Sequence, residues 1–121
     1  MLKILGRATS ANVQAVMWVA EELGQPVERV DWGGKFGGND DPAFRAVSPA
    51  GLVPAMRDGD LAMFESPAMV RYLGAPYGDE AFWPADPAAR AALAQCAEGA
   101  HTSLPAARPR GLCLPRLPPT A

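Results

Sequence analysis

The side chains that could support redox or metal chemistry are few and lie late in the chain. The two cysteines, Cys96 and Cys113, are too far apart for a Cys-x-x-Cys redox pair, and the one histidine is His101. Three such groups do not form a zinc ligand set, so we expect no bound metal. A glutaredoxin-like disulfide reductase is also disfavoured, because no cysteine precedes Cys96. We interpret His101 as a residue on a helix surface.

A glycine-rich segment, residues 33–41, is the next candidate for ligand binding. It holds four glycines and two aspartates. A phosphate-binding loop of the Walker type requires Gly-Lys-Ser/Thr at the start of a helix, whereas Lys35 is followed here by Phe36. We therefore predict a flexible loop without a helix or strand in its interior.

Length and charge exclude several classes of protein. The chain has 121 residues, of which 49% are hydrophobic and 20% are charged, which suffices for one domain of ordinary size. Its formal net charge is −2 and its pI is about 5.3, so it lacks a basic footprint for nucleic acid. No apolar run approaches the roughly 20 residues of a membrane span, and the start is not that of a signal peptide. We expect a cytoplasmic protein that binds neither nucleic acid nor membrane.

Hydrophobic periodicity predicts a βαβ unit at the N-terminus. Residues 3–5 form a short apolar run that ends at Gly6, and residues 27–32 alternate loosely, as strands do. Between them, apolar residues recur at helical spacing: Val13, Val16, Met17, Ala20 and Leu23. Gly24 and Pro26 end this helix, and the handedness of such units makes the two strands parallel.

The middle of the chain predicts a short helix followed by a hairpin. Residues 42–47 are predicted to be helical, with Asp41 as the N-cap. Residues 53–57 and 61–64 flank Asp58-Gly59, a dipeptide typical of tight hairpin turns. These two segments are therefore predicted to be antiparallel strands.

A second long helix follows the hairpin. Ser66 is predicted to cap it, and Pro67 fits its first turn, where no backbone N–H is required. The helix continues through Leu73. Large side chains at element positions are expected to pack in the core or between domains: Met17, Trp18, Trp32, Met56, Met69 and Trp83.

Together these elements predict an α/β domain with the order β-α-β-α-β-β-α over residues 1–75. We expect a linker at residues 76–86 and one further helix at residues 87–104. Residues 105–121 contain five prolines and three arginines and are expected to be disordered or extended. The charge changes abruptly before this tail, because all 13 acidic side chains lie within residues 1–98.

Three stretches resemble the N-terminal, thioredoxin-like domain of the glutathione S-transferases, in serine-type, bacterial-looking members. They are residues 10–16 (SANVQAV), residues 48–56 (SPAGLVPAM) and residues 65–73 (ESPAMVRYL). Each stretch alone is a weak signal, but the combination is specific. With the first strand and the linker, the resemblance covers residues 1 to about 100.

The resemblance implies a role for Ser10. In serine-type members, a serine hydroxyl at the start of the first helix donates a hydrogen bond to the glutathione sulfur, and Ser10 matches this position. Such a donor, together with the positive end of a helix dipole, favours the thiolate over the thiol. Two alternatives stay open: Ser10 or Asn12 merely caps the helix, and Thr9 is a second candidate hydroxyl.

The resemblance also implies how the tripeptide is bound. Pro54 matches a cis-proline that directs the N–H and C=O of Val53 toward the bound peptide, the alternative being a trans proline at a strand edge. Glu65 is expected to bind the ammonium group of the γ-glutamyl residue. Ser66, with the free N–H groups of its helix, is expected to bind the α-carboxylate.

Two residues complicate this assignment. Pro67 stands where the family usually has Asn, Gly or Cys, so one N–H is absent near the carboxylate and weaker binding is expected. Lys35 either binds the glycine carboxylate of glutathione or is an exposed, solubilising lysine.

The implied activity is a glutathione transferase reaction. Its co-substrate is glutathione, its second substrate is a small electrophile, and the family forms homodimers. In the family an all-helical second domain supplies the electrophile pocket, and residues 87–104 match only its first helix. We expect this truncation to impair activity and to expose apolar surface.

The composition of the tail leads to the hypothesis of a reading-frame change near residues 99–106. The alternatives to an enzyme are a non-catalytic module that binds glutathione or a protein, and a defunct fragment.

Overall fold

The computed structural model describes residues 1–102, apart from the side chains of residues 97 and 99–102. The predictions for Cys113, for the side chain of His101 and for the tail at residues 105–121 lie outside this part. The chain divides into two compact units, Met1–Asp79 and the residues from Glu80 onward, and each is described by itself.

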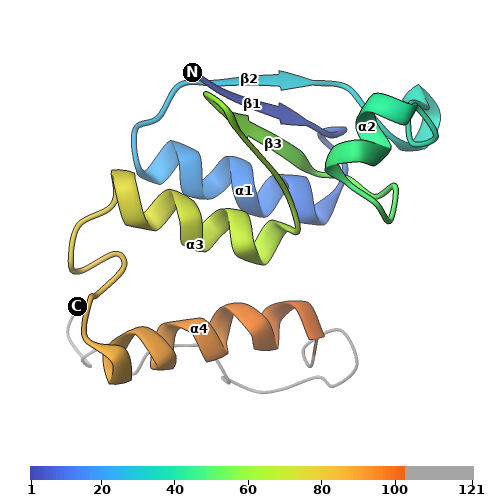
Figure 1. The fold of residues 1–121 in the computed structure, drawn as a ribbon. Helices are drawn as coiled ribbons and strands as arrows, with labels where there is room; N and C mark the ends of the chain where they lie inside the picture. The colour runs from blue at the N-terminus through green and yellow to red at the C-terminus, as the bar shows by residue number, and fades with distance from the viewer. Residues whose placement is uncertain (103–121) are drawn as a thin grey trace. The chain divides into compact units, whose positions relative to one another are not determined.

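Four strands of the first unit form one mixed sheet in the order β2-β1-β3-β4 (Figure 1). They are β1 (Leu2–Leu5), β2 (Val27–Val30), β3 (Ala55–Asp58) and β4 (Leu61–Phe64). β1 is parallel to β2, as predicted, and antiparallel to β3, which is antiparallel to β4. β3 starts two residues later than predicted, because Pro54 has no N–H to donate to the strand ladder.

Two helices, α1 (Ala11–Glu22) and α3 (Ser66–Tyr77), cover one face of the sheet (Figure 1). The predicted apolar stripe of α1 is confirmed, since Val13, Val16 and Ala20 are buried. Side chains of both helices and of β1 and β3 form a single buried cluster: Leu2, Ile4, Val13, Val16, Ala20, Met56, Met69 and Leu73. Burial of each large apolar side chain contributes about 1.5–3 kcal/mol, so this cluster holds both helices on the sheet.

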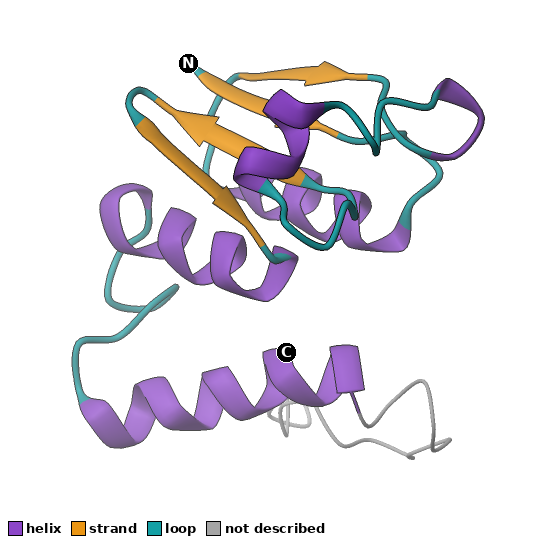
Figure 2. Cartoon of the chain, turned by 45° about the vertical axis from the view of Figure 1, so that its right-hand side comes forward, coloured by secondary structure: helices purple, strands orange, loops and turns teal. Residues whose placement is uncertain are grey.

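The short helix α2 (Pro42–Val47) lies over the opposite face of the sheet (Figure 2). The predicted N-cap is confirmed, because Oδ1 of Asp41 accepts hydrogen bonds from the N–H of Ala43 at 2.8 Å and of Phe44 at 3.4 Å. Phe44 is buried, and its ring centroid lies 5.6 Å from that of Trp32. Trp32 therefore packs as expected.

The glycine-rich segment contains a short 3₁₀ helix, η1 (Gly34–Phe36), so the prediction of a loop without helix is wrong at these residues. Gly33 and Gly37 flank η1 with φ values of 81° and 68°. The N–H of Gly33 donates to the carbonyl of Gly37 at 2.7 Å. Left-handed glycines thus reverse the chain on both sides of a single turn, which is how a helix forms despite the composition.

Two further predictions require correction. α3 begins at Ser66 with Glu65 at the N-cap position, so Ser66 is the first helical residue and not the cap, and the helix continues to Tyr77, past the expected start of the linker. Trp18 is 71% exposed, so a place in the core is wrong for it, whereas the alternative of packing between domains stays a prediction. It lies beside the buried stripe of α1, and its Nε1–H donates to Oε1 of Glu22 at 3.2 Å.

The second unit contains α4 (Pro87–Thr102). Oδ2 of Asp86, the residue before this helix, accepts a hydrogen bond from the N–H of Ala89 at 2.9 Å. The Arg90 guanidinium lies over the Trp83 ring, 5.0 Å from its centroid. Among residues 1–102, no helix is long and apolar enough to cross a membrane.

Asp58, at the end of β3, is hydrogen-bonded to α3 by two tyrosines. Its Oδ2 accepts from the hydroxyl of Tyr77 at 2.6 Å and from that of Tyr72 at 2.8 Å. These bonds lower the pKa of Asp58, the Tyr77 bond having the larger effect, and the same bond raises the pKa of Tyr77 to about 12. The carboxylate thereby joins the hairpin to the second half of α3.

We expect Asp58→Asn to destabilise the first unit. Because the pKa of Asp58 is lowered in the folded state, its contribution is present above the unfolded-state pKa of about 3.9 and is lost as pH falls through the lower, folded-state pKa. We expect the substitution to lower the free energy of unfolding at pH 7 by about 1 kcal/mol. This is less than a buried hydrogen bond to a charged group contributes, because the carboxylate is partly exposed. Urea unfolding at pH 7 and at acid pH measures this loss, which should shrink in acid.

Asp60→Asn is the matched control, because it removes the same charge from the same turn and Asp60 has no hydrogen bond to any other described residue. Equal effects of the two substitutions at pH 7 would show that net charge, and not the tyrosine contacts, is responsible.

Candidate functional site

Strand directions bring three segments of the first unit to one end of the sheet. β1 and β4 run in the same direction, because each is antiparallel to β3. α1 follows β1 and α3 follows β4, so both helices begin at the same end, where β3 also begins. The first turns of α1 and α3 therefore lie near the segment that precedes β3.

A small cleft of about 80 Å³ lies where these segments meet. Its walls come from all three: Asn12, Ser48, Ala50, Leu52, Val53, Pro54, Phe64, Glu65 and Ser66. The structure thus brings together four residues that the resemblance assigned to one site, Val53, Pro54, Glu65 and Ser66.

The Val53–Pro54 peptide bond is cis, as the resemblance implied. Pro54 is buried in the cleft wall. The N–H and C=O of Val53 make no hydrogen bond to any other described residue. An unpaired main-chain donor and acceptor beside a cleft can pair with an extended peptide as an added strand does.

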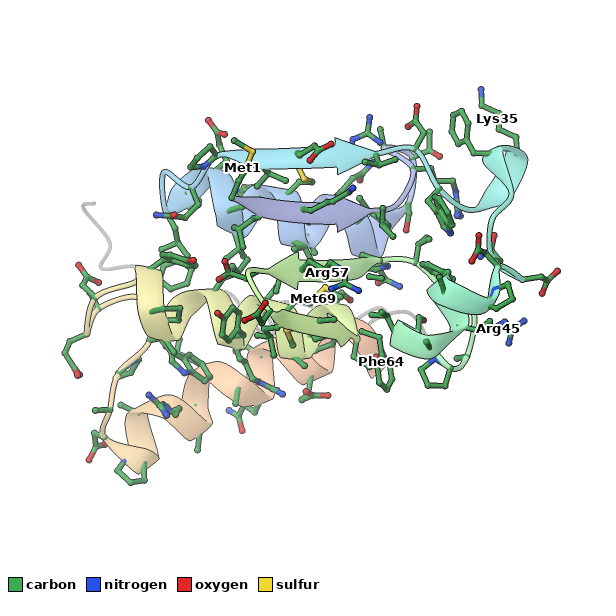
Figure 3. The ribbon with its side chains drawn as sticks, turned by 45° about the horizontal axis from the view of Figure 1, so that its top comes forward. Met1, Lys35, Arg45, Arg57, Phe64 and Met69 are labelled. Atoms are coloured by element: carbon green, nitrogen blue, oxygen red, sulfur yellow. The ribbon has the colours of Figure 1, made fainter. Side chains whose placement is uncertain are left out.

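Arg45 of α2 holds the turn that leads into the cleft; Figure 3 labels this side chain. Its Nη1 donates to the carbonyl of Pro49 at 3.1 Å, and its Nε donates to that of Asn39 at 3.0 Å. The Asn39 amide in turn donates to the carbonyl of Gly51 at 2.7 Å. Gly51 has φ 69°, and a Cβ there would lie 2.7 Å from Cζ of Arg45, so the turn requires glycine. These contacts position Val53.

Glu65 has an unusual backbone conformation at the edge of the cleft. Its φ of 73° and ψ of 106° are unfavourable for a residue with a side chain and cost about 1–3 kcal/mol. Its carboxylate is exposed and makes no hydrogen bond to another described residue. An unpaired carboxylate at this position can accept a hydrogen bond from an ammonium group.

Ser66 places a hydroxyl and an N–H at the positive end of α3. The residue is 4% exposed, and its hydroxyl has no partner among residues 1–102. The first hydrogen bond of the helix runs from the N–H of Met69 to the carbonyl of Glu65 at 3.0 Å. The N–H groups of Ser66 and Ala68 are therefore free, and Pro67 has none. This helix start is suited to a carboxylate.

Ser10 is the N-cap of α1 and is 8% exposed. Its Oγ accepts a hydrogen bond from the N–H of Val13 at 3.4 Å, so the capping alternative is observed. Ser10 and Thr9 are not among the residues that line the cleft. A hydroxyl that accepts one hydrogen bond keeps its own proton to donate, so capping does not preclude a contact with a thiolate.

Asn12 lines the cleft, although the sequence indicated it only as an alternative cap. It is exposed in the first turn of α1, and its side chain makes no hydrogen bond to another described residue. Its amide carries two N–H donors. A polar side chain two residues after a capping serine, in a first turn already assigned to a site, is the signal that could have identified it.

Lys35 lies outside the cleft lining, in η1, and points outward from the first unit (Figure 3). Its ammonium group lies 5.1 Å from the centroid of the neighbouring Phe36 ring. The structure therefore does not place Lys35 with the other four predicted residues. No group of three or more potential metal ligands occurs among the described residues.

Residues 5–81 match the sequence profile of the glutathione S-transferase N-terminal domain. The chain belongs to the glutathione S-transferase family. Glutathione S-transferase GstB of Escherichia coli (strain K12) is 42% identical over 123 aligned positions, which cover 98% of this chain and 59% of GstB. That alignment also covers residues 99–106, where the composition suggested a change of reading frame. Glutathione S-transferase 3 of Zea mays is 39% identical over 79 positions, covering 65% of this chain and 36% of the maize protein.

Solved transferase structures share the fold. The theta class glutathione S-transferase from Xanthomonas axonopodis pv. citri, solved with glutathione bound, superposes with a TM-score of 0.80 at 42% identity over 87% of this chain and 50% of that one. Glutathione transferase F2 from Populus trichocarpa gives a TM-score of 0.78 at 27% identity. The first unit is therefore the thioredoxin-like domain that the resemblance implied. The chain spans about half the length of these relatives.

The backbone of Glu65 yields a prediction about stability. Glu65→Gly and Glu65→Ala remove the same carboxylate, but only glycine adopts positive φ without strain. We expect the glycine variant to be more stable than the alanine variant by about 1 kcal/mol, which raises Tm by about 4–8 °C in a domain of this size. Thermal unfolding monitored by circular dichroism measures the difference. An alanine variant as stable as the glycine variant would mean that residue 65 relaxes to negative φ.

Proposed function

We propose that the cleft binds glutathione and that the protein holds its thiol as a thiolate for attack on a small electrophile. The observation that carries the proposal is the arrangement around the cleft, where the unpaired backbone of Val53 lies with an unpaired carboxylate and the free start of α3. These groups complement the three parts of a γ-glutamyl-cysteinyl peptide.

Each part of the ligand has a partner of matching chemistry. The Val53 N–H and C=O pair with the main chain of the cysteinyl residue. The Glu65 carboxylate accepts from the ammonium group, and the Ser66 hydroxyl and N–H donate to the α-carboxylate. Two free N–H groups in place of three, the result of Pro67, make this subsite weaker than one without proline.

The N-terminal turn of α1 provides the donors for the sulfur. The Ser10 O–H and the Asn12 amide both belong to this turn, and the helix dipole adds to their effect. The thiol loses its proton to solvent, and the sulfur of the thiolate then forms a bond to the electrophilic carbon. The leaving group departs with the electrons of its broken bond, or an added carbanion takes a proton from water.

The proposal extends to the setting of the reaction. Reduced glutathione is maintained in the cytoplasm, so we propose that the protein acts there. The homodimer implied by the resemblance is likewise proposed, and sedimentation of the purified chain tests it. Lys35 is retained only as a candidate for the glycine carboxylate, because it would have to turn toward the cleft.

The thiolate assignment predicts a shift in the pKa of bound glutathione. Loss of one donor to a charged group corresponds to about one to two pKa units. We expect Ser10→Ala or Asn12→Ala to raise the pKa of the bound thiol by this amount, measured by ultraviolet absorbance of the thiolate across pH at saturating glutathione. Thr9→Ala tests the alternative hydroxyl: a shift in Thr9→Ala and none in Ser10→Ala would assign the contact to Thr9. If all three variants match the wild type, none of these three residues donates to the sulfur.

The carboxylate assignment predicts a coupled loss of affinity. We expect Ser66→Ala to weaken glutathione binding by about tenfold in isothermal titration. A glutathione analogue without the α-carboxylate should bind wild type and Ser66→Ala equally, because the missing group is the one that Ser66 contacts. An equal loss for both ligands would place the effect of Ser66 elsewhere.

A conjugation assay on the same samples separates the two candidate functions. Binding accompanied by conjugation supports the transferase. Binding without conjugation supports the non-catalytic glutathione-binding module, and absence of binding contradicts both.

A further inference from the structure

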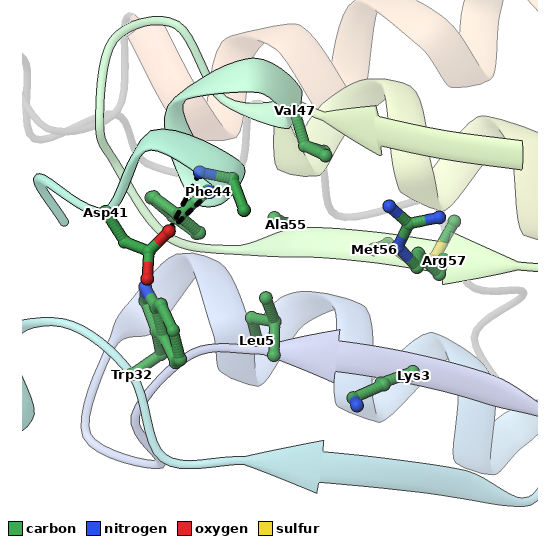
Figure 4. Close-up of a pocket in the computed structure, with 10 residues that line it drawn as sticks. Lys3, Leu5, Trp32, Asp41, Phe44, Val47, Ala55, Met56 and Arg57 are labelled. Carbon is green, nitrogen blue, oxygen red and sulfur yellow. Dashed lines mark hydrogen bonds between the residues drawn. The ribbon is translucent and has the colours of Figure 1, made fainter. Parts of the chain in front are cut away.

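A second and larger cavity, of about 270 Å³, lies between α2 and the sheet. It shares no lining residue with the cleft described above. Its walls come from β1, β3, α2 and the segment between β2 and α2: Lys3, Leu5, Trp32, Asp41, Ala43, Phe44, Val47, Ala55, Met56 and Arg57 (Figure 4).

The alternation of strand residues gives the cavity an apolar floor and a basic end. Leu5 and Ala55 are directly opposite each other in the β1–β3 register, and so are Lys3 and Arg57. Side chains two positions apart share a face of the sheet, so all four project toward α2. Figure 4 shows Lys3 and Arg57 at one end of the cavity and Trp32 at the other.

The two cations have no counter-charge in contact with them. The side chains of Lys3 and Arg57 make no ion pair or hydrogen bond with another described residue. Like charges directly opposite on neighbouring strands repel each other, so this pair is unfavourable in the empty protein. An anion between them would remove the repulsion and gain both attractions.

The acidic groups nearby do not fill this role. Glu28 lies beside Lys3 in the β1–β2 register, but no ion pair joins them. The Asp41 carboxylate, which Figure 4 shows near Trp32, already accepts the two N–H groups that start α2.

We propose that this cavity binds a small amphipathic anion, an aromatic or branched alkyl carboxylate. The apolar body lies against Leu5, Phe44 and Val47, and the carboxylate lies between Lys3 and Arg57. At about 30 Å³ for each water of the liquid, the cavity has room for about nine waters or for one ring with a short chain. This proposal does not depend on glutathione binding.

Titration of the full chain with 4-phenylbutyrate tests the proposal, with 4-phenylbutanamide as the neutral counterpart. The buried indole N–H of Trp32 is the reporter in two-dimensional NMR, and Trp32→Phe assigns its signal. For a ligand of this size we expect a Kd on the order of 1 mM, and binding of the amide about tenfold weaker. Saturating glutathione should leave the titration unchanged.

Four variants locate the ligand. Arg57→Gln and Lys3→Gln should each weaken binding by about fivefold, whereas Lys35→Gln removes the same charge outside the cavity and should have no effect. Val47→Phe should abolish binding by filling the cavity beside α2, and its circular dichroism verifies folding. Equal affinity for acid and amide, competition by glutathione, or no shift of the Trp32 signal at about 10 mM ligand would each overturn the proposal.

Discussion

The direction of β3 is the constraint on which the rest of the first unit depends. Because β3 runs antiparallel to both β1 and β4, the strands that precede α1 and α3 end at the side of the sheet where β3 begins. Both helices pack on the same face through one buried cluster, so their first turns meet the Val53–Pro54 segment. The strand topology therefore sets the position of the cleft, and the residues around it provide the hydrogen-bond donors and acceptors.

Local contacts then refine the site that topology locates. Arg45 and Asn39 hold the Gly51 turn from the side of α2, and the strained backbone of Glu65 turns the chain into α3. At the opposite end of β3, Asp58 binds two tyrosines of α3. The third strand is thus held at both ends, so the position of Val53 is set by contacts distributed over most of the first unit.

The two faces of the sheet are covered to different extents. The face toward α1 and α3 is filled by aliphatic and methionine side chains and is closed. On the other face α2 has only six residues and covers part of the sheet, which leaves a cavity between apolar side chains and a pair of lysine and arginine. This difference separates the cleft that we propose binds glutathione from the proposed carboxylate site.

Sequence alone determined the order of the strands and of the helices α1 to α4, because these depend on local signals: the spacing of Val13, Val16 and Ala20, the cap at Asp41 and the hairpin turn before Leu61. The resemblance added the cis bond before Pro54. Local signals do not carry distance or direction. They therefore did not show that Asn12 lines the cleft while Ser10 caps its helix, that Lys35 points away, or that Asp58 binds Tyr72 and Tyr77. The helix η1 was also missed, because the glycine-rich composition of residues 33–41 indicates a loop, whereas Gly33 and Gly37 at positive φ allow one helical turn between them. Tertiary structure decided these points, because strand register and helix packing determine which side chains distant in sequence come into contact.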